Sequence, residues 1–125
     1  MAVTAYASGT LTAVVGTETT FGNAGTPYLV GTSDVATAGT FTLHVDLINM
    51  AAGDTVELRI YQIVLTGGTR RVAYQQTFSG IQATDNMVQI SVPISNELTN
   101  TASLRFTLKQ TVGTARTFAW KVLSY

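Results

Sequence analysis

The sequence of 125 residues predicts an all-β chain that folds as a single β-sandwich. A jelly-roll arrangement is favoured, with an immunoglobulin-like sandwich as the runner-up. After residue 40, apolar and polar residues alternate with a period of two, which is the pattern of half-buried strands. No window of about 11 or more residues keeps a helical period. Turn residues separate the alternating runs at roughly 8–15-residue spacing, as in sandwiches and barrels.

The alternation defines six strands, each bounded by turn residues. They cover residues 41–47, 55–65, 72–78, 88–94, 103–109 and 117–122. Gly67 and Gly68 predict a two-residue hairpin, because both positions tolerate positive φ angles. Pro93 has no N–H for a ladder, so its strand is expected to end there or to lie at a sheet edge.

The strand at 55–65 changes its alternation partway along. Even-numbered positions are apolar up to Ile60, after which Tyr61, Ile63 and Leu65 become the apolar series. Either a β-bulge or a segment buried on both faces explains the change. A bulge would also let the strand bend from one sheet toward the other.

Residues 1–40 lack strict alternation. Strands are predicted at residues 10–15 and 28–30, on either side of a small, polar stretch. We expect residues 1–27 to form an N-terminal extended arm or irregular region, and residues 28–125 to form the sandwich domain. Such an uncharged arm can add a strand to a neighbour's sheet edge. Its deletion is therefore expected to abolish assembly and to leave the domain folded.

The composition excludes several classes of protein. Charged residues make up 11% of the chain and the net charge is zero, against about 25% charged residues in an average domain. Threonine, with 22 residues, makes up much of this shortfall in charged residues. No block of like charge is present to bind the phosphates of a nucleic acid. No apolar run reaches the ~20 residues that span a bilayer. The Val, Ile, Leu and aromatic content also argues against disorder.

Cysteine is absent, so disulfides, zinc–thiolate sites and thiol nucleophiles are excluded. The N-terminus has neither the basic residues nor the apolar core of a signal peptide. The absence of cysteine favours folding in the cytoplasm, and the mature chain is expected to start where the sequence starts.

The sequence contains no recognisable catalytic constellation. Asp46 follows His44, the single histidine, on the same strand face, which is a weak metal or acid–base signal; a surface histidine is the commoner interpretation. Glu57 and Arg59 are expected to form an exposed ion pair. The seven acids form no calcium loop or glycosidase pair, and nucleophile elbows and phosphate loops are absent. We predict a non-enzymatic protein with no catalytic, cofactor-binding or metal-binding residues.

Two further patterns bear on binding. Four aromatic residues are candidates for a sugar-stacking platform, although Trp120 in an alternating strand is better explained as core: Tyr61, Tyr74, Trp120 and Tyr125. Residues 1–58 hold five acids and no Lys or Arg, whereas residues 59–125 hold all seven basic residues and two acids. These opposite charges either mix within one sandwich or meet across a subunit boundary.

Four stretches resemble strands of small virion proteins of tailed bacteriophages, most closely capsid decoration (cement) proteins. They are Phe41–Leu47, Met50–Tyr61, Arg70–Phe78 and Leu104–Thr111. The resemblance spans most of residues 40–125 and is one of style, without a diagnostic motif. It implies trimers, or monomers clustered at symmetry axes, on the outside of an icosahedral shell. It also implies an N-terminal arm that contacts the major capsid protein.

The resemblance leads us to expect a capsid-stabilising decoration protein, made in the host cytoplasm and located on the capsid exterior. Its expected partners are the major capsid protein and copies of itself, with no nucleic acid and no membrane. The alternatives are a tail, neck or fibre component of the virion, and a carbohydrate-binding or adhesin module. Weak glycan binding is a further expectation.

Overall fold

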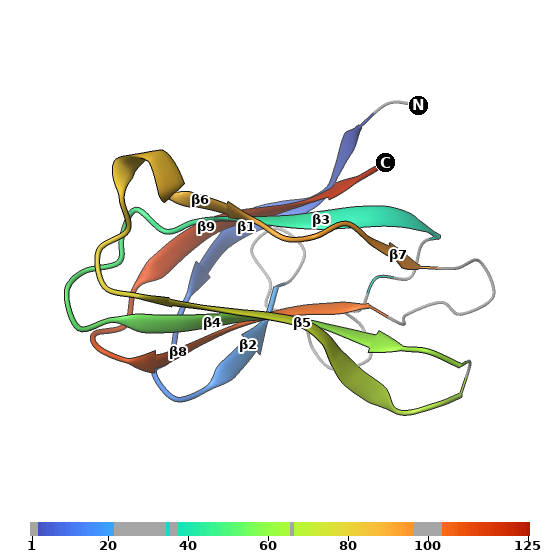
Figure 1. The fold of residues 1–125 in the computed structure, drawn as a ribbon, viewed down its shortest axis with the longest axis horizontal. Helices are drawn as coiled ribbons and strands as arrows, with labels where there is room; N and C mark the ends of the chain where they lie inside the picture. The colour runs from blue at the N-terminus through green and yellow to red at the C-terminus, as the bar shows by residue number, and fades with distance from the viewer. Residues whose placement is uncertain (1–2, 22–34, 36–37, 66, 97–103) are drawn as a thin grey trace.

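The computed structural model describes residues 3–21, 35, 38–65, 67–96 and 104–125. In this part of the chain, antiparallel strands form two facing sheets, which confirms the predicted all-β sandwich (Figure 1). The expected strand at residues 28–30 lies outside the described residues. No helix long and apolar enough to cross a membrane occurs among the residues described.

The first sheet has the strand order β1-β9-β3-β6, and β7 also pairs with β3. Its strands are β1 (Thr4–Thr12), β9 (Thr117–Ser124), β3 (Gly39–Asp46), β6 (Val88–Ile90) and β7 (Ile94–Asn96). Because β6 and β7 pair with opposite ends of β3, together they act as one interrupted edge strand.

The second sheet has the order β2-β8-β4-β5. Its strands are β2 (Glu18–Thr20), β8 (Arg105–Val112), β4 (Thr55–Ile63) and β5 (Arg70–Ser79). A 3-10 turn, η1 (Thr84–Asn86), leads from β5 to β6. Along the chain, every step between consecutive strands passes from one sheet to the other, except the β4–β5 hairpin and the step from β6 to β7.

The structure corrects two predicted details of the later strands and confirms a third. The pairing of β4 with β5 shifts register between Ile60 and Tyr61, but the extra residue of this bulge is Ala73 of β5. Strand β4 pairs with β8 without a shift at the same point, so the bulge that was expected in β4 lies in its partner strand.

The predicted two-residue hairpin is wrong, because six residues separate Ile63 at the end of β4 from Arg70 at the start of β5. Of the two glycines in this longer turn, Gly67 has a positive φ, of 81°, and Gly68 does not. Pro93 lies between β6 and β7, where the edge strand is interrupted.

The core lies between the two sheets and is built from the inward-facing residues of both. Its largest side chains with under 2% exposure include four phenylalanines, Phe21, Phe41, Phe106 and Phe118. Rings from distant parts of the chain meet there: the Phe21 and Trp120 centroids are 5.1 Å apart. Trp120 is 6% exposed, which confirms that it belongs to the core.

The N-terminal segment differs from the expected separate arm. Strand β1 pairs with β9 from Thr4↔Ser124 to Thr12↔Thr117, and β2 pairs with β8. This segment also buries Leu11 and Phe21 in the core. The sequence pattern did not reveal these strands, because only a few of their small, polar residues are buried. Their backbone nevertheless completes both sheets. Residues 22–27 of the expected arm lie outside the described part.

A buried carboxylate joins two turns at one end of the sandwich. Asp54 is 1% exposed and accepts hydrogen bonds from the N–H of Ala51 (2.9 Å) and of Thr114 (3.3 Å). Its Oδ2 also pairs with Nε of Arg116 at 2.8 Å. A side chain at Gly113 would collide with this carboxylate, and its φ is 104°. Asp54 therefore holds the β3–β4 turn against the β8–β9 turn.

Candidate functional site

A polar hollow of about 340 Å³ lies on the outer face of the second sheet. We call it the arginine hollow. It is lined by Glu18, Thr20, Tyr61, Arg70, Arg105 and Thr107. These residues come from β2, β4, β5 and β8, so the hollow exists only in the folded sheet. Strand alternation places Tyr61 and Thr107 outward, while Ile60 and Phe106 point into the core.

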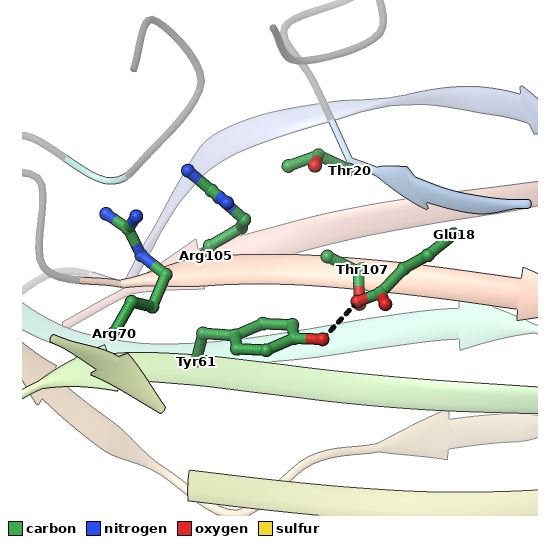
Figure 2. A pocket seen from close by; sticks show the side chains of 6 residues that line it. All are labelled: Glu18, Thr20, Tyr61, Arg70, Arg105 and Thr107. Atoms are coloured by element: carbon green, nitrogen blue, oxygen red, sulfur yellow. Dashed lines mark hydrogen bonds between the residues drawn. The ribbon is translucent and has the colours of Figure 1, made fainter. Parts of the chain in front are cut away.

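The two ends of the arginine hollow differ in chemistry. Figure 2 shows the Arg70 and Arg105 side chains at one end and the Glu18 carboxylate beside Thr107 at the other. The Tyr61 side chain extends between them, with its hydroxyl directed at Glu18. One end is thus cationic, and the other offers hydroxyl and carboxylate oxygens.

Glu18 is held in place by the strands beside it. Its Oε2 accepts hydrogen bonds from the hydroxyls of Tyr61 and Thr107, both at 2.6 Å. Its Oε1 pairs with Nη1 of Arg59 at 3.1 Å. Burial opposes the charged form, but the two hydroxyl bonds and the positive charges of Arg59 and Lys109 outweigh it and lower the pKa of Glu18. Glu18 therefore stays ionised and fixes the position of the Tyr61 ring.

The predicted Glu57–Arg59 pair is present on the same face. Nη2 of Arg59 lies 3.0 Å from Oε2 of Glu57, and both side chains are partly buried rather than fully exposed. Arg59 thereby bridges Glu57 and Glu18. Burial and the hydrogen bond to Glu18 raise the pKa of Tyr61 above its usual value.

A second, more apolar depression of about 520 Å³ lies on the outer face of the first sheet. We call it the histidine groove. Its lining includes Ser8, His44, Asp46, Ala119 and Lys121. Nε2 of His44 is 3.0 Å from the hydroxyl of Thr42, and burial together with the charge of Lys121 lowers the pKa of His44.

The structure gives Asp46 a local role. Its Oδ1 accepts a hydrogen bond from the N–H of Ile48 at 3.0 Å, which caps the turn after β3. Within the described residues, no three side chains of His, Cys, Asp or Glu gather as a metal site would need.

The four aromatic candidates do not form one platform. Tyr61 lies in the arginine hollow, whereas Trp120 is in the core against Phe21. Tyr74 is half-buried on β5 and packs against the core, and Tyr125 follows β9 in the other sheet. The prediction of a joint stacking surface is therefore wrong, and Tyr61 alone remains beside a hollow.

The ion pairs of the described residues join the two halves of the sequence. Glu18 and Glu57 from the acidic half pair with Arg59, and Asp54 pairs with Arg116. Charges that are segregated along the chain thus mix within one sandwich. This was the first of the two interpretations of the charge pattern.

Strand β1 leaves one backbone edge without a partner among the described strands. The N–H of Ala13 donates to the carbonyl of Arg116 at 2.9 Å, so this pair is hydrogen-bonded. Bonded and non-bonded pairs alternate along an antiparallel ladder. Ser8, Thr10 and Thr12 therefore direct their N–H and C=O groups away from β9. We call these groups the free edge of β1.

The other edges are protected in ways that β1 is not. Natural sheets guard edges with short strands, prolines and charges. Strand β2 has three residues, Pro93 interrupts the β6–β7 edge, and β5 carries Arg70 and Arg71. Strand β1 spans nine residues without a charge or a proline. Its pairing with β9 shifts register between Ala5 and Ala7, and the regular stretch from Ala7 to Thr12 is the least guarded edge of those described.

Sequence reasoning missed both the arginine hollow and the free edge of β1. Each depends on strands from residues 4–20, where the sequence predicts an arm. The polar outer faces of β4 and β8 were visible as the residues alternating with the apolar ones, and that signal would have located half of the hollow.

Comparisons with protein-family models, with curated proteins and with solved structures find no significant match to this chain.

Proposed function

We propose that this chain is a non-enzymatic structural protein that binds the outside of an icosahedral capsid and stabilises it, as a decoration (cement) protein does. The observation that carries the proposal is the free edge of β1, a nine-residue edge strand without a charged residue. An edge of this kind pairs with an extended segment of a partner. Main-chain hydrogen bonds then supply the affinity.

The composition of the surface supports the same proposal. Interface centres are depleted of charge, and charged residues are only 11% of this chain. Several large apolar side chains are more than half exposed, including Ile48, Val88 and Ile90. A surface of hydroxyls and scattered apolar groups suits contact with neighbours in an assembly.

The strand order favours the jelly-roll form of the sandwich over the immunoglobulin-like form. Nearly every connection crosses between the sheets, whereas an immunoglobulin-like sandwich contains hairpins within a sheet. Jelly rolls occur in viral capsid and lectin domains. This supports a virion role.

We propose the major capsid protein as the partner that supplies the pairing segment, and copies of the chain as neighbours in a trimer or symmetric cluster. The location that follows is the capsid exterior, after synthesis in the host cytoplasm.

The test is to add the purified chain to assembled shells that lack it. A decoration protein binds assembled shells, does not bind unassembled capsid protein, and raises the melting temperature of the shell. Quantitative mass spectrometry of the virion should give a copy number in proportion to the capsid protein. A few copies per particle would instead indicate a tail, neck or fibre component and would overturn the capsid assignment.

A further inference from the structure

The geometry points to a second binding site that is independent of shell binding: the arginine hollow takes a single sugar residue that carries a carboxylate, such as a uronic acid. The carboxylate would lie against Arg70 and Arg105, and the hydroxylated ring would lie along Tyr61 toward Glu18 and Thr107.

The cationic end of the hollow determines the anionic group. Arg70 and Arg105 come from different strands and line the same hollow. A guanidinium group presents a planar fork that matches a carboxylate. Each carries five N–H donors, so a ligand can share these groups with partners in the protein.

The opposite end of the arginine hollow indicates that the rest of the ligand is neutral. Glu18 is ionised, and its pKa is lowered despite burial. It would repel a second anionic group, which disfavours ligands charged at both ends. An ionised carboxylate has about four acceptor positions, and Oε1 of Glu18 accepts a bond from Arg59 alone among the described residues. A position therefore remains on Oε1 to accept a sugar hydroxyl.

The size and rigidity of the hollow suit a monosaccharide unit. Its volume of about 340 Å³ is at the lower end of the range for small-ligand sites. Glu18, Tyr61 and Thr107 are already joined by hydrogen bonds of 2.6 Å. Binding therefore need not order these side chains, which reduces its entropic cost. The Tyr61 ring gives the sugar a fixed surface to pack against.

The test titrates the full chain with methyl β-D-glucuronide and with methyl β-D-glucoside, followed by two-dimensional NMR of the backbone amides. The two probes differ only in the carboxylate. We expect the glucuronide to bind at least about tenfold more tightly, with shifts at residues of β2, β4 and β8 beside the hollow. Equal binding of both probes, or shifts confined to the first sheet, would overturn the assignment.

Two further probes define the ligand class. Acetate should bind much more weakly than the glucuronide, because it lacks the ring. A methyl glucuronide that carries a sulfate on a ring hydroxyl should also bind more weakly, because the added negative charge faces Glu18. Acetate or the sulfated glucuronide binding as tightly as the glucuronide would contradict a site for a carboxylated sugar.

Variants distinguish binding in the arginine hollow from a general effect of the charge of the protein. Arg70→Gln and Arg105→Gln should each weaken glucuronide binding about tenfold or more. Arg71→Gln is the matched control, because Arg71 is exposed on the same strand, lies outside the hollow and loses the same charge. Arg105→Lys keeps the charge without the planar fork and should also lose affinity, which keeps the test valid if a glutamine variant does not fold. Loss of binding in Arg71→Gln equal to that in Arg105→Gln would contradict the proposal.

Discussion

At the scale of single residues, the fold depends on a few polar side chains that are buried with all their partners in place. Asp54 is the clearest case, because its carboxylate joins a backbone turn to Thr114 and Arg116. Gln110, which is fully buried, acts similarly: its amide bonds the carbonyl of Thr114 at 2.7 Å and the N–H of Arg116 at 3.1 Å. These contacts hold the turns at one end of the sandwich together.

Replacing Asp54 should therefore cost far more than replacing a surface acid. We expect Asp54→Asn to lower the free energy of unfolding by about 2–3 kcal/mol, because a buried charge-assisted network loses its central acceptor. Urea denaturation measures this. Asp85→Asn is the control: Asp85 is exposed in η1, and its loss should change stability by about 0.5 kcal/mol or less. Equal effects of the two changes would show that Asp54 is not the link described.

The same carboxylates make stability depend on pH. The N–H of Ala51 and the Arg116 pair lower the pKa of Asp54 against the effect of burial, and the pKa of Glu18 is lowered as well. A carboxyl with a lowered folded pKa stabilises the fold above its unfolded pKa of about 4. Stability should thus be complete above about pH 5 and fall as the pH drops below about 4.

Urea midpoints measured from pH 7 to pH 3 test this sign, and the decline should be smaller in Asp54→Asn. Midpoints that rise on acidification would contradict it.

Residues were predictable from the sequence where their partners are close in the chain. The Glu57–Arg59 pair follows from alternation along one strand. The burial of Asp54 was not predictable, because Asp54 appears in the sequence as a turn residue. Its partners Thr114 and Arg116 lie on another turn, 60 or more positions away. The role of Glu18 was not predictable for the same reason, since its partner Thr107 lies 89 positions away.

At the scale of elements, alternation predicted the strands that present one apolar face to the core. β3, β4, β8 and β9 bury residues at every second position along most of their length, so their pattern is strong. β1 is an edge strand that buries only Ala7 and Leu11 of its nine residues, which leaves little pattern to read. Edge strands contribute backbone bonds more than apolar area, and sequence periodicity does not report those bonds.

The N-terminal strands should nevertheless be essential to stability. Phe21 is fully buried, packs on Trp120 and donates its N–H to the carbonyl of Phe106 at 2.8 Å. We expect Phe21→Ala to cost about 3–5 kcal/mol, measured by thermal or urea unfolding. Val14→Ala is the control, because Val14 is 60% exposed and should cost about 0.5 kcal/mol or less. A small effect of Phe21→Ala on stability would mean that the N-terminal segment is not part of the folded core.

At the scale of the whole molecule, the two sheets differ in what their outer faces offer. The second sheet carries the ion-paired cluster around Glu18 and the arginine hollow. The first sheet ends in the uncharged free edge of β1. The proposed contact with a shell is made through that edge. The two-sheet architecture was predictable from the spacing of strands, but the identity of its edges was not, because edges depend on strand order.

Binding through main-chain hydrogen bonds should depend little on ionic strength. Screening affects pairs of charges, and the Debye length shrinks from about 10 Å at 0.1 M to 3 Å at 1 M salt. We expect the affinity for shells to change less than about threefold over this range. Co-sedimentation with shells at increasing NaCl concentrations measures it. A steep loss of binding with salt would point to a charged face instead of β1.

The most direct test of the central claim is the binding of Thr10→Pro to assembled shells. The N–H of Thr10 points to the free edge, so proline removes a donor without breaking the ladder to β9. Thr10→Ser keeps the donor and is the matched control, and thermal unfolding verifies that both variants fold. If proline disturbs the fold, Thr10→Lys guards the same edge with a charge. The account predicts wild-type binding for Thr10→Ser and at least about tenfold weaker binding for a folded Thr10→Pro or Thr10→Lys. Wild-type binding by such a folded variant would contradict it.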